Sequence, residues 1–423
     1  MITAAVAELE QSLRQLLPPL PEIKRVWVGF SGGLDSTVLL WLASRVIPAE
    51  QIQALYINHN LQKQADKWHQ HCAAICQPIG VSFSAISVSP KSSSENDARD
   101  ARYQAFESQL TKGDLLLLGH HQDDQAETVL MRLFRGASVV GLAGMPQQRP
   151  LGEGRLLRPL LNVPRLTLEK IARDAGLVWV EDPSNAQNQY LRNWVRNELG
   201  ELLSQRWPGW SSRLAQSAVN FEQAADLHRE LALIDAQGEF TNPLPLSAAV
   251  RARPNRLENL IYYWLREQGT QVSSRRQLED LQAIACVQES AVGRWTLGEA
   301  SVHLYREQLW YEATPIATQQ TVRLRLEPGC SCLSSGVLEA ELADFGLPFG
   351  AEVELRGRQP GDRLNLGLGH QSVKKFMNDK KLPPWLRDSW PLIVLEGEII
   401  SIVGVWSSAE ALQPGGLQLK WLR

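Results

Sequence analysis

The sequence has few cysteines, no long apolar run and no excess of basic charge. Five cysteines in 423 residues, an odd number, suggest no disulfide framework and favour a reducing, cytoplasmic location. No apolar run approaches the roughly 20 residues of a membrane span, and the N-terminal stretch lacks the features of a signal peptide, so no membrane partner is expected. The formal net charge is −3, so any surface that binds nucleic acid must be local.

A length of 423 residues exceeds what one hydrophobic core supports and predicts two or three domains. Over residues 1–210, short β-branched runs alternate with helical patterns, which is typical of a doubly wound α/β domain with a parallel sheet. Residues 211–314 are mainly helical in pattern and predict a middle domain that positions the substrate. Over residues 315–423, β-branched runs bounded by glycine predict a small α+β domain.

A glycine-rich turn between a predicted strand and a predicted helix is the most informative stretch. Residues 26–30 have the content of a buried strand, and residues 37–42 resemble a helix packed on a sheet. The first N–H groups of a helix have no intrahelical partner and carry partial positive charge, so the turn predicts an anion site. The residues expected to bind a nucleotide there are Ser31, Gly32, Gly33, Leu34, Asp35 and Ser36.

The composition of this turn also indicates the chemistry. It lacks the lysine of a Walker A motif, and it contains Asp35, which would repel phosphate unless Mg²⁺ lay between them. The composition therefore predicts bound Mg²⁺ and cleavage at the α-phosphate of a nucleotide, with pyrophosphate held by the turn. The alternative is an ordinary strand–turn–helix connection that uses glycine and serine only for its geometry.

Residues 31–36 resemble the SGGxDS signature of the PP-loop ATP pyrophosphatases, which make adenylated intermediates. A second stretch, residues 119–128, reads GHHQDDQAET. From the residues alone it fits either a metal cluster or an acidic first helical turn, with His120 and Asp124 four apart on one helical face. It resembles the second signature of the tRNA-modifying PP-loop enzymes. That resemblance implies Asp124, rather than Asp123, as a catalytic residue and magnesium ligand beside Asp35.

Residues 96–103 resemble the NxARxxRY element of one subfamily, the tRNA(Ile)-lysidine synthetases. From spacing alone, a surface helix with ion pairs is favoured. The resemblance implies instead that the element borders the active site, so Arg102 becomes a catalytic candidate and Arg99 a substrate contact. Further segments resemble the family and follow in the family's order. They are residues 135–145, residues 158–161, the Asp-Pro-Ser-Asn run at 182–185, and Arg192 with Arg196. This order over some 200 residues makes the resemblance specific.

Two basic segments are candidates for binding tRNA. Residues 148–173 are locally basic, and residues 356–387 contain eight basic and two acidic residues. Phe376 and Trp385 lie within the second segment and are expected to stack on bases, the alternative being a solvated charged face with core aromatics. The candidates for binding tRNA are Arg192, Arg196, Arg358, Lys374 and Lys375.

The resemblance to the lysidine synthetases implies a complete reaction. ATP adenylates the C2 oxygen of the wobble cytidine in tRNA(Ile) with a CAU anticodon, and the amine of free L-lysine then displaces AMP to give lysidine. The expected partners are therefore this tRNA and free lysine. The sequence does not reveal the oligomeric state, and a homodimer is one option.

Two other functions stay open at this point. The first is a PP-loop tRNA 2-thiolation enzyme, which would need a reactive cysteine; Cys72 and Cys76 do not form a CxxC pair, and burial is expected for all five cysteines. The second is a non-catalytic RNA-binding protein that retains a nucleotide fold. ATP turnover that depends on Asp35 distinguishes an enzyme from that protein.

Overall fold

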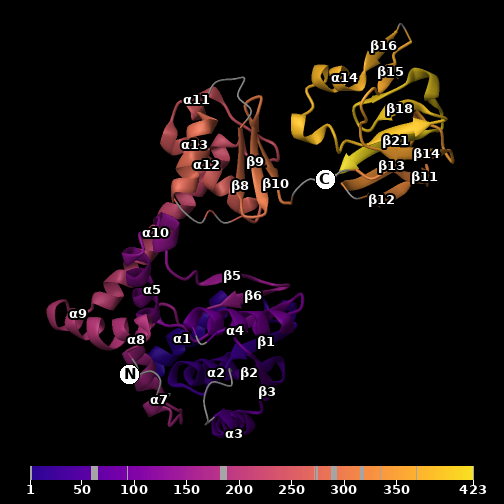
Figure 1. Ribbon diagram of the computed structural model, residues 1–423. Helices are drawn as coiled ribbons and strands as arrows, with labels where there is room; N and C mark the ends of the chain where they lie inside the picture. The colour runs from indigo at the N-terminus through magenta and orange to yellow at the C-terminus, as the bar shows by residue number, and fades with distance from the viewer. Residues whose placement is uncertain are drawn as a thin grey trace. The chain divides into compact units, whose positions relative to one another are not determined.

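The protein was examined as a computed structural model, which describes residues 2–58, 65–92, 94–181, 188–270, 272, 275–286, 293–314, 319–333, 335–367 and 369–422. The chain divides into two compact units, Met1–Leu227 and His228–Arg423. In Figure 1 the first unit runs from indigo to magenta and the second runs on through orange to yellow. No helix in the described part of the chain is long and apolar enough to cross a membrane.

The first unit is built on one six-stranded sheet, with the strand order β3-β2-β1-β4-β6-β5. All neighbouring strands are parallel except β5 and β6, which form an antiparallel hairpin. The predicted doubly wound parallel sheet is therefore confirmed, and the hairpin at its edge is an addition. The strands are β1 (Arg25–Gly29), β2 (Ile52–Asn58), β3 (Ser82–Ser87), β4 (Asp114–Leu117), β5 (Gln148–Leu151) and β6 (Gly154–Leu157).

Both faces of this sheet are covered by buried side chains. Alternate residues of a strand point to opposite sides, so one strand contributes to the cluster on each face. In β1, Val26 and Val28 belong to one buried cluster and Trp27 belongs to the other. Helices α2 and α7 contribute to the first cluster, and α4 contributes to the second. The helices of this unit are α1 (Ile2–Leu16), α2 (Leu34–Val46), α3 (Ala65–Cys76), α4 (Glu95–Gln109), α5 (Gln122–Phe134), α6 (Val139–Leu142), α7 (Arg165–Asp174), α8 (Leu191–Trp194) and α9 (Gly200–Arg206).

Helix α10 (Trp210–Asp235) spans the division between the two units. The helical part of the second unit then packs around Trp264, which is fully buried. The helices and closing strands predicted from residue 257 to residue 310 are confirmed. They are α11 (Ala248–Arg251), α12 (Pro254–Glu267), α13 (Arg275–Ala285), β7 (Leu244–Pro245), β8 (Gly293–Leu297), β9 (Ala300–Tyr305) and β10 (Gln308–Glu312).

The rest of the second unit consists of antiparallel sheets with one short helix, in agreement with the predicted α+β fold. A five-stranded sheet has the order β11-β14-β17-β18-β19, and β13 pairs with β12, β20 and β21. The elements are β11 (Val322–Arg325), β12 (Gly329–Leu333), β13 (Gly336–Leu347), β14 (Glu352–Arg356), β15 (Arg363–Asn365), β16 (His370–Ser372), α14 (Val373–Asp379), β17 (Leu392–Leu395), β18 (Glu398–Ile402), β19 (Trp406–Ser407), β20 (Gln413–Pro414) and β21 (Leu417–Leu422).

Two expectations about side chains in the chain are wrong. Cys72 and Cys76 are buried, but Cys286, Cys330 and Cys332 are exposed, so burial does not hold for all five cysteines. Phe376 was expected to stack on bases, but it lies in a hydrophobic core with Trp406, since it occupies the inner face of α14.

Candidate active site

The glycine-rich turn joins β1 to α2 and is held in shape by its own hydroxyl groups. The Ser31 N–H donates to Ser36 Oγ at 3.2 Å, and the two serine hydroxyl oxygens lie 3.1 Å apart. Ser36 Oγ donates to the Gly33 carbonyl at 3.0 Å, and Thr37 Oγ1 donates to the same oxygen at 2.9 Å. The first turn of α2 therefore starts at a fixed loop, and its N–H groups point out of the helix end.

Glycine allows a close approach at two places where chain segments meet. Gly32 has φ +77°, and a Cβ added there would lie 2.8 Å from the Cys72 sulfur. Gly119 follows β4, and a Cβ added there would lie 3.1 Å from the backbone carbonyl of Asp35. The turn after β1 and the turn after β4 are thus in direct contact at the carboxyl edge of the sheet, where ligands bind in this class of fold.

A cavity of about 560 Å³ opens at this edge. That volume lies within the range of small-molecule and cofactor sites. Its wall includes the turn residues Ser31, Gly33, Leu34, Asp35 and Ser36, so these predicted nucleotide-binding residues share one site. Other lining residues are Tyr56, Arg102, His120, Asp124, Arg165 and Glu181. The structure therefore brings Asp35, Asp124 and Arg102 together, as the sequence predicted.

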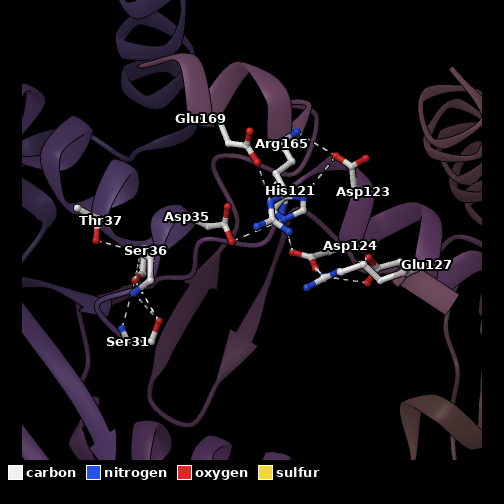
Figure 2. A network of polar contacts seen from close by, with 12 residues as sticks. Ser31, Asp35, Ser36, Thr37, His121, Asp123, Asp124, Glu127, Arg165 and Glu169 are labelled. Atoms are coloured by element: carbon white, nitrogen blue, oxygen red, sulfur yellow. Dashed lines mark hydrogen bonds and ion pairs between the residues drawn. The ribbon is translucent and has the colours of Figure 1, made fainter. Parts of the chain in front are cut away.

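His121, at the start of α5, lies among three carboxylates (Figure 2). Its Nε2 is 3.7 Å from Asp35 Oδ2 and 3.5 Å from Asp124 Oδ2, and its Nδ1 is 3.6 Å from Asp123 Oδ2. Burial lowers the pKa of His121, but the three carboxylates more than offset this and raise the pKa overall. The imidazole is therefore biased toward its protonated form and acts as a cation between Asp35 and Asp124.

Asp124 and Glu127 share one face of α5, and both are bound by two arginines. Arg196 donates to Asp124 Oδ1 at 2.8 Å and to Glu127 Oε1 at 2.7 Å. Arg192 donates to the same two carboxylates, at 3.2 and 3.0 Å. Burial raises the pKa of Asp124, but His121 and the two arginines outweigh it and hold that pKa well below its usual range. Arg192 and Arg196, predicted to bind tRNA, therefore neutralise buried acids at the cavity wall.

Asp35 is the carboxylate whose environment fits a magnesium ion best. Its Oδ1 is buried and has no hydrogen-bond partner among the described residues. Burial raises the pKa of Asp35, and the charge of Asp124 raises it further. A cation at this oxygen would satisfy it and favour the charged form. By contrast, Asp124 already accepts hydrogen bonds from the backbone N–H of His121 and from both arginines.

The prediction that His120 and Asp124 lie four residues apart on one helix is wrong, because α5 begins at Gln122. His120 precedes the helix, and its Nδ1 accepts a hydrogen bond from Arg158 Nε at 3.3 Å. Burial lowers the pKa of His120 to about 3, so the ring is neutral. In the described part of the chain, no group of three or more His, Cys, Asp or Glu side chains is arranged to hold a metal ion.

The tRNA-binding candidates in the second unit differ from one another in exposure and in ion pairing. Lys374 and Lys375 are exposed on α14. Arg358 is bound by Asp388, with its Nε 3.1 Å from Asp388 Oδ1. Arg356, counted in the same basic segment, is bound by Asp362 at 2.8 Å. The basic surface of residues 356–387 is therefore smaller than the sequence suggested.

Several functional residues were not among the predicted site residues. Glu127 lies three residues after Asp124 on the same face of the predicted helix, and this spacing was the available signal. Trp179 and Val180 line the cavity, and the Val180 N–H donates to the Gly32 carbonyl at 2.9 Å, but no motif marks them. The predicted Asp-Pro-Ser-Asn segment at 182–185 lies outside the described residues.

The sheet, the turn and the cavity together define a nucleotide-binding α/β domain of the PP-loop class. A family model described as a PP-loop domain matches residues 5–203. Models described as the TilS substrate binding domain and the TilS substrate C-terminal domain match residues 244–310 and 353–421.

Curated relatives narrow this class to one family. The tRNA(Ile)-lysidine synthase of Pseudomonas syringae pv. tomato is 36% identical, over 94% of this chain and 92% of its own length. That of Pseudomonas aeruginosa is 34% identical, over 98% of this chain and 97% of its own length. The chain belongs to the tRNA(Ile)-lysidine synthase family. Among solved structures, the U34-tRNA thiolase NcsA of Methanococcus maripaludis matches 51% of this chain and 80% of its own, at 18% identity and a TM-score of 0.41.

Proposed function

We propose that this chain is an ATP-dependent ligase that joins free L-lysine to C2 of the wobble cytidine in tRNA(Ile) with a CAU anticodon. The C2 oxygen attacks the α-phosphate of ATP and pyrophosphate leaves. The lysine ε-amine then forms the C2–N bond as the C2–O bond to AMP breaks. The observation that carries the proposal is the cavity of about 560 Å³ whose wall includes Ser31 and residues 33–36, in a chain of the lysidine synthase family.

The activation step follows from the turn and the carboxylate beside it. A cytidine carbonyl has no leaving group, and adenylation supplies one. The N-terminal end of α2 and the hydroxyls of Ser31 and Ser36 are suited to bind the departing pyrophosphate. Mg²⁺ fits Asp35 Oδ1, and when bound it offsets negative charge that develops on the phosphate oxygens. Asp124 was predicted as a second ligand, but we assign it mainly to holding Arg192 and Arg196.

The other cavity residues suit the second substrate and the transition state. Arg102 and Arg165 bring positive charge to the cavity wall, which favours binding of a phosphate group. Glu181 is an exposed carboxylate at the same wall and can attract the α- or ε-ammonium group of free lysine. The reacting amine must be neutral, so it loses its proton in the site before it attacks C2.

We also propose a division of labour along the chain. Residues 1–210 carry the chemistry, residues 211–314 position the tRNA, and residues 315–423 bind its backbone through Lys374 and Lys375. The exposure of both lysines on α14 supports this assignment, since phosphate contacts by lysine and arginine supply most nonspecific affinity for nucleic acids. The reaction is expected in the cytoplasm, where ATP, lysine and unmodified tRNA meet.

The proposal is tested by analysing the modified nucleoside. The protein is incubated with ATP, Mg²⁺, lysine and an unmodified tRNA(Ile) transcript, and the tRNA is digested to nucleosides and analysed by mass spectrometry. The expected product is a cytidine whose mass has increased by lysine less water. An unmodified cytidine, with AMP still formed in the presence of tRNA, would remove lysine as the nucleophile.

The thiolation alternative is less favoured by the cysteines. Cys72 lies under the nucleotide turn, but it is fully buried, and burial with the neighbouring Cys76 raises the pKa of its thiol to about 12. A thiolation enzyme needs a thiolate near the nucleotide. The chain's curated relatives are also lysidine synthases, which agrees with this ranking.

A further inference from the structure

Three arginines surround the side chain of Tyr103 in the first unit. The guanidinium carbons of Arg99 and Arg149 lie 5.0 and 5.2 Å from the centre of the tyrosine ring. Arg158 donates to the tyrosine hydroxyl oxygen at 3.2 Å, and Arg99 donates to it at 3.4 Å. These residues come from α4, from β5 and from the residue that follows β6, so the fold brings together positive charges that are up to 59 positions apart in sequence.

Arg158 is the most unusual member of this cluster, because it is only 2% exposed. Its hydrogen bonds in the described part of the chain go to uncharged acceptors: Tyr103 Oη, the Pro146 carbonyl at 2.7 Å and His120 Nδ1. Arg99 donates to the Tyr103 hydroxyl oxygen, and Arg149 donates to the Pro150 carbonyl. A buried cation without a carboxylate partner is costly, so an unbalanced cluster of this kind is suited to an anion supplied by a ligand.

The contrast with the neighbouring arginines supports this reading. Arg192 and Arg196 are also buried in the first unit, but Asp124 and Glu127 balance their charge directly. Around Tyr103, by contrast, burial would raise the pKa of the hydroxyl, but Arg99 and Arg158 outweigh it and lower that pKa below its ordinary value. The hydroxyl therefore reports a positive potential at the centre of the cluster.

We propose that Arg99 and Arg149, which lie partly exposed around Tyr103 with the buried Arg158 behind them, form a binding site for a backbone phosphodiester of the tRNA. The site rests on the proposed function and specifies how its RNA substrate is held. Guanidinium groups and a hydroxyl are the donors that bind a phosphate oxygen well. The site borders the nucleotide cavity, because Arg158 binds His120, and His120 lines that cavity.

The lining of the nucleotide cavity favours an RNA phosphate over a phosphate of ATP. Tyr103 and the three arginines do not line the nucleotide cavity, whose arginines are Arg102, Arg165 and Arg196.

The test measures binding of an unmodified tRNA(Ile) CAU transcript to the full chain at several salt concentrations, without ATP. The variant is Arg99→Gln with Arg149→Gln, because both side chains are partly exposed and their loss leaves Arg158 in place. The matched control is Lys24→Gln with Lys112→Gln, which removes two exposed charges. Both lysines lie just before the N-terminal ends of β1 and β4, whereas the nucleotide turn follows the C-terminal end of β1. A second variant, Tyr103→Phe, removes only the hydroxyl.

We expect the arginine variant to bind tRNA about tenfold more weakly and to reduce the slope of log K against log salt by roughly 0.7 to 0.9 for the lost phosphate contact. The control should keep the slope of the wild type. Tyr103→Phe should weaken binding by a smaller factor. An unchanged slope in the arginine variant would overturn the site. Weaker binding of a nonhydrolysable ATP analogue, with tRNA binding unchanged, would also overturn it, because the anion would then belong to the nucleotide.

This test is separate from the test of the proposed function. If the arginine variant binds tRNA like the wild type and the wild type still attaches lysine, the phosphate site is wrong and the function stands. If the wild type attaches no lysine but its tRNA binding depends on Arg99 and Arg149, the function is wrong and the site stands.

Discussion

Arg196 binds the carboxylate of Glu127 with two parallel hydrogen bonds, Nε to Oε1 at 2.7 Å and Nη2 to Oε2 at 3.0 Å. Glu127 is 2% exposed, and Arg192 is its second partner. We predict that Arg196→Ala lowers the free energy of unfolding of the first unit by about 1.5 to 3 kcal/mol, because it removes hydrogen bonds to a buried carboxylate that Arg192 still pairs in part. Urea denaturation of the full chain measures this loss.

The matched control for Arg196→Ala is Arg275→Ala, which breaks an exposed pair with Glu279 on α13. Exposed pairs of this kind contribute about 0.3 to 0.5 kcal/mol. Similar losses in the two variants would show that burial does not set the strength of the Arg196 pair. Arg196→Lys keeps the charge but not the paired donors, so its loss in free energy of unfolding should fall between the losses of the other two variants.

Gly32 and Gly33 are adjacent, but only the first needs to be glycine. Gly32→Ala places a side chain at φ +77° and 2.8 Å from the Cys72 sulfur, whereas a Cβ at Gly33 comes no closer than 3.4 Å, to the Ser31 hydroxyl. We predict that Gly32→Ala weakens ATP binding at least tenfold because the turn must shift, while Gly33→Ala changes it by less than about threefold. Titration with a nonhydrolysable ATP analogue measures both. Equal effects would contradict the geometry of the turn.

The cysteines divide into an inert and a reactive group. Burial raises the pKa of both Cys72 and Cys76 to about 12, whereas Cys286, Cys330 and Cys332 are exposed. We predict that iodoacetamide at neutral pH modifies the three exposed cysteines in the folded protein and leaves the two buried ones intact, as peptide mass spectrometry can measure. Single Cys→Ser substitutions at the exposed positions should leave lysine incorporation unchanged. Loss of activity in any of these three would revive the thiolation alternative.

His120 should make stability depend on pH. Burial lowers its pKa from 6.5 to about 3, so below pH 6.5 the unfolded chain binds a proton that the folded chain does not bind. Its contribution to stability is therefore complete above pH 6.5 and falls as the pH drops toward 3, with a slope of at most about 1.4 kcal/mol per pH unit. His120→Gln keeps an acceptor for Arg158 but cannot titrate.

The measurement for His120 is the free energy of unfolding of the wild type and of His120→Gln at pH 7.5 and at about pH 5. We predict that the wild type loses more stability on acidification than the variant does, because only the wild type carries the histidine. Parallel losses in the two proteins would show that His120 does not titrate on unfolding, and the neutral ring inferred from its burial would be wrong.

Much of the fold was accessible from local patterns. The buried strand at 26–30, the turn at 31–36 and the following helix are encoded in one continuous stretch, so periodicity and glycine placement were sufficient. The same holds for the cavity residues Asp35 and Asp124, which follow strands that end at one edge of the sheet. The β5–β6 hairpin was not recognised, because its short strands have no distinct period.

The pairing of charges was not accessible from the sequence. Arg192 and Arg196 were predicted to bind tRNA, and their partners Asp124 and Glu127 lie 65 to 72 residues earlier. Whether an arginine meets a carboxylate or a ligand depends on tertiary packing, which local spacing does not encode. The same limit explains Arg358, whose partner Asp388 lies 30 residues away, and Phe376, whose helix turns it into the core.

The most direct test of the proposed function is incorporation of radiolabelled lysine into an unmodified tRNA(Ile) CAU transcript, with ATP and Mg²⁺, by the wild type and by Asp35→Ala. The account predicts ATP-dependent label in the tRNA with the wild type and a loss of at least a hundredfold in the variant, because Asp35 provides the unpartnered oxygen at the nucleotide turn. Incorporation that is unaffected by ATP or by Asp35→Ala would contradict the assigned site, and no incorporation by the wild type would contradict the function.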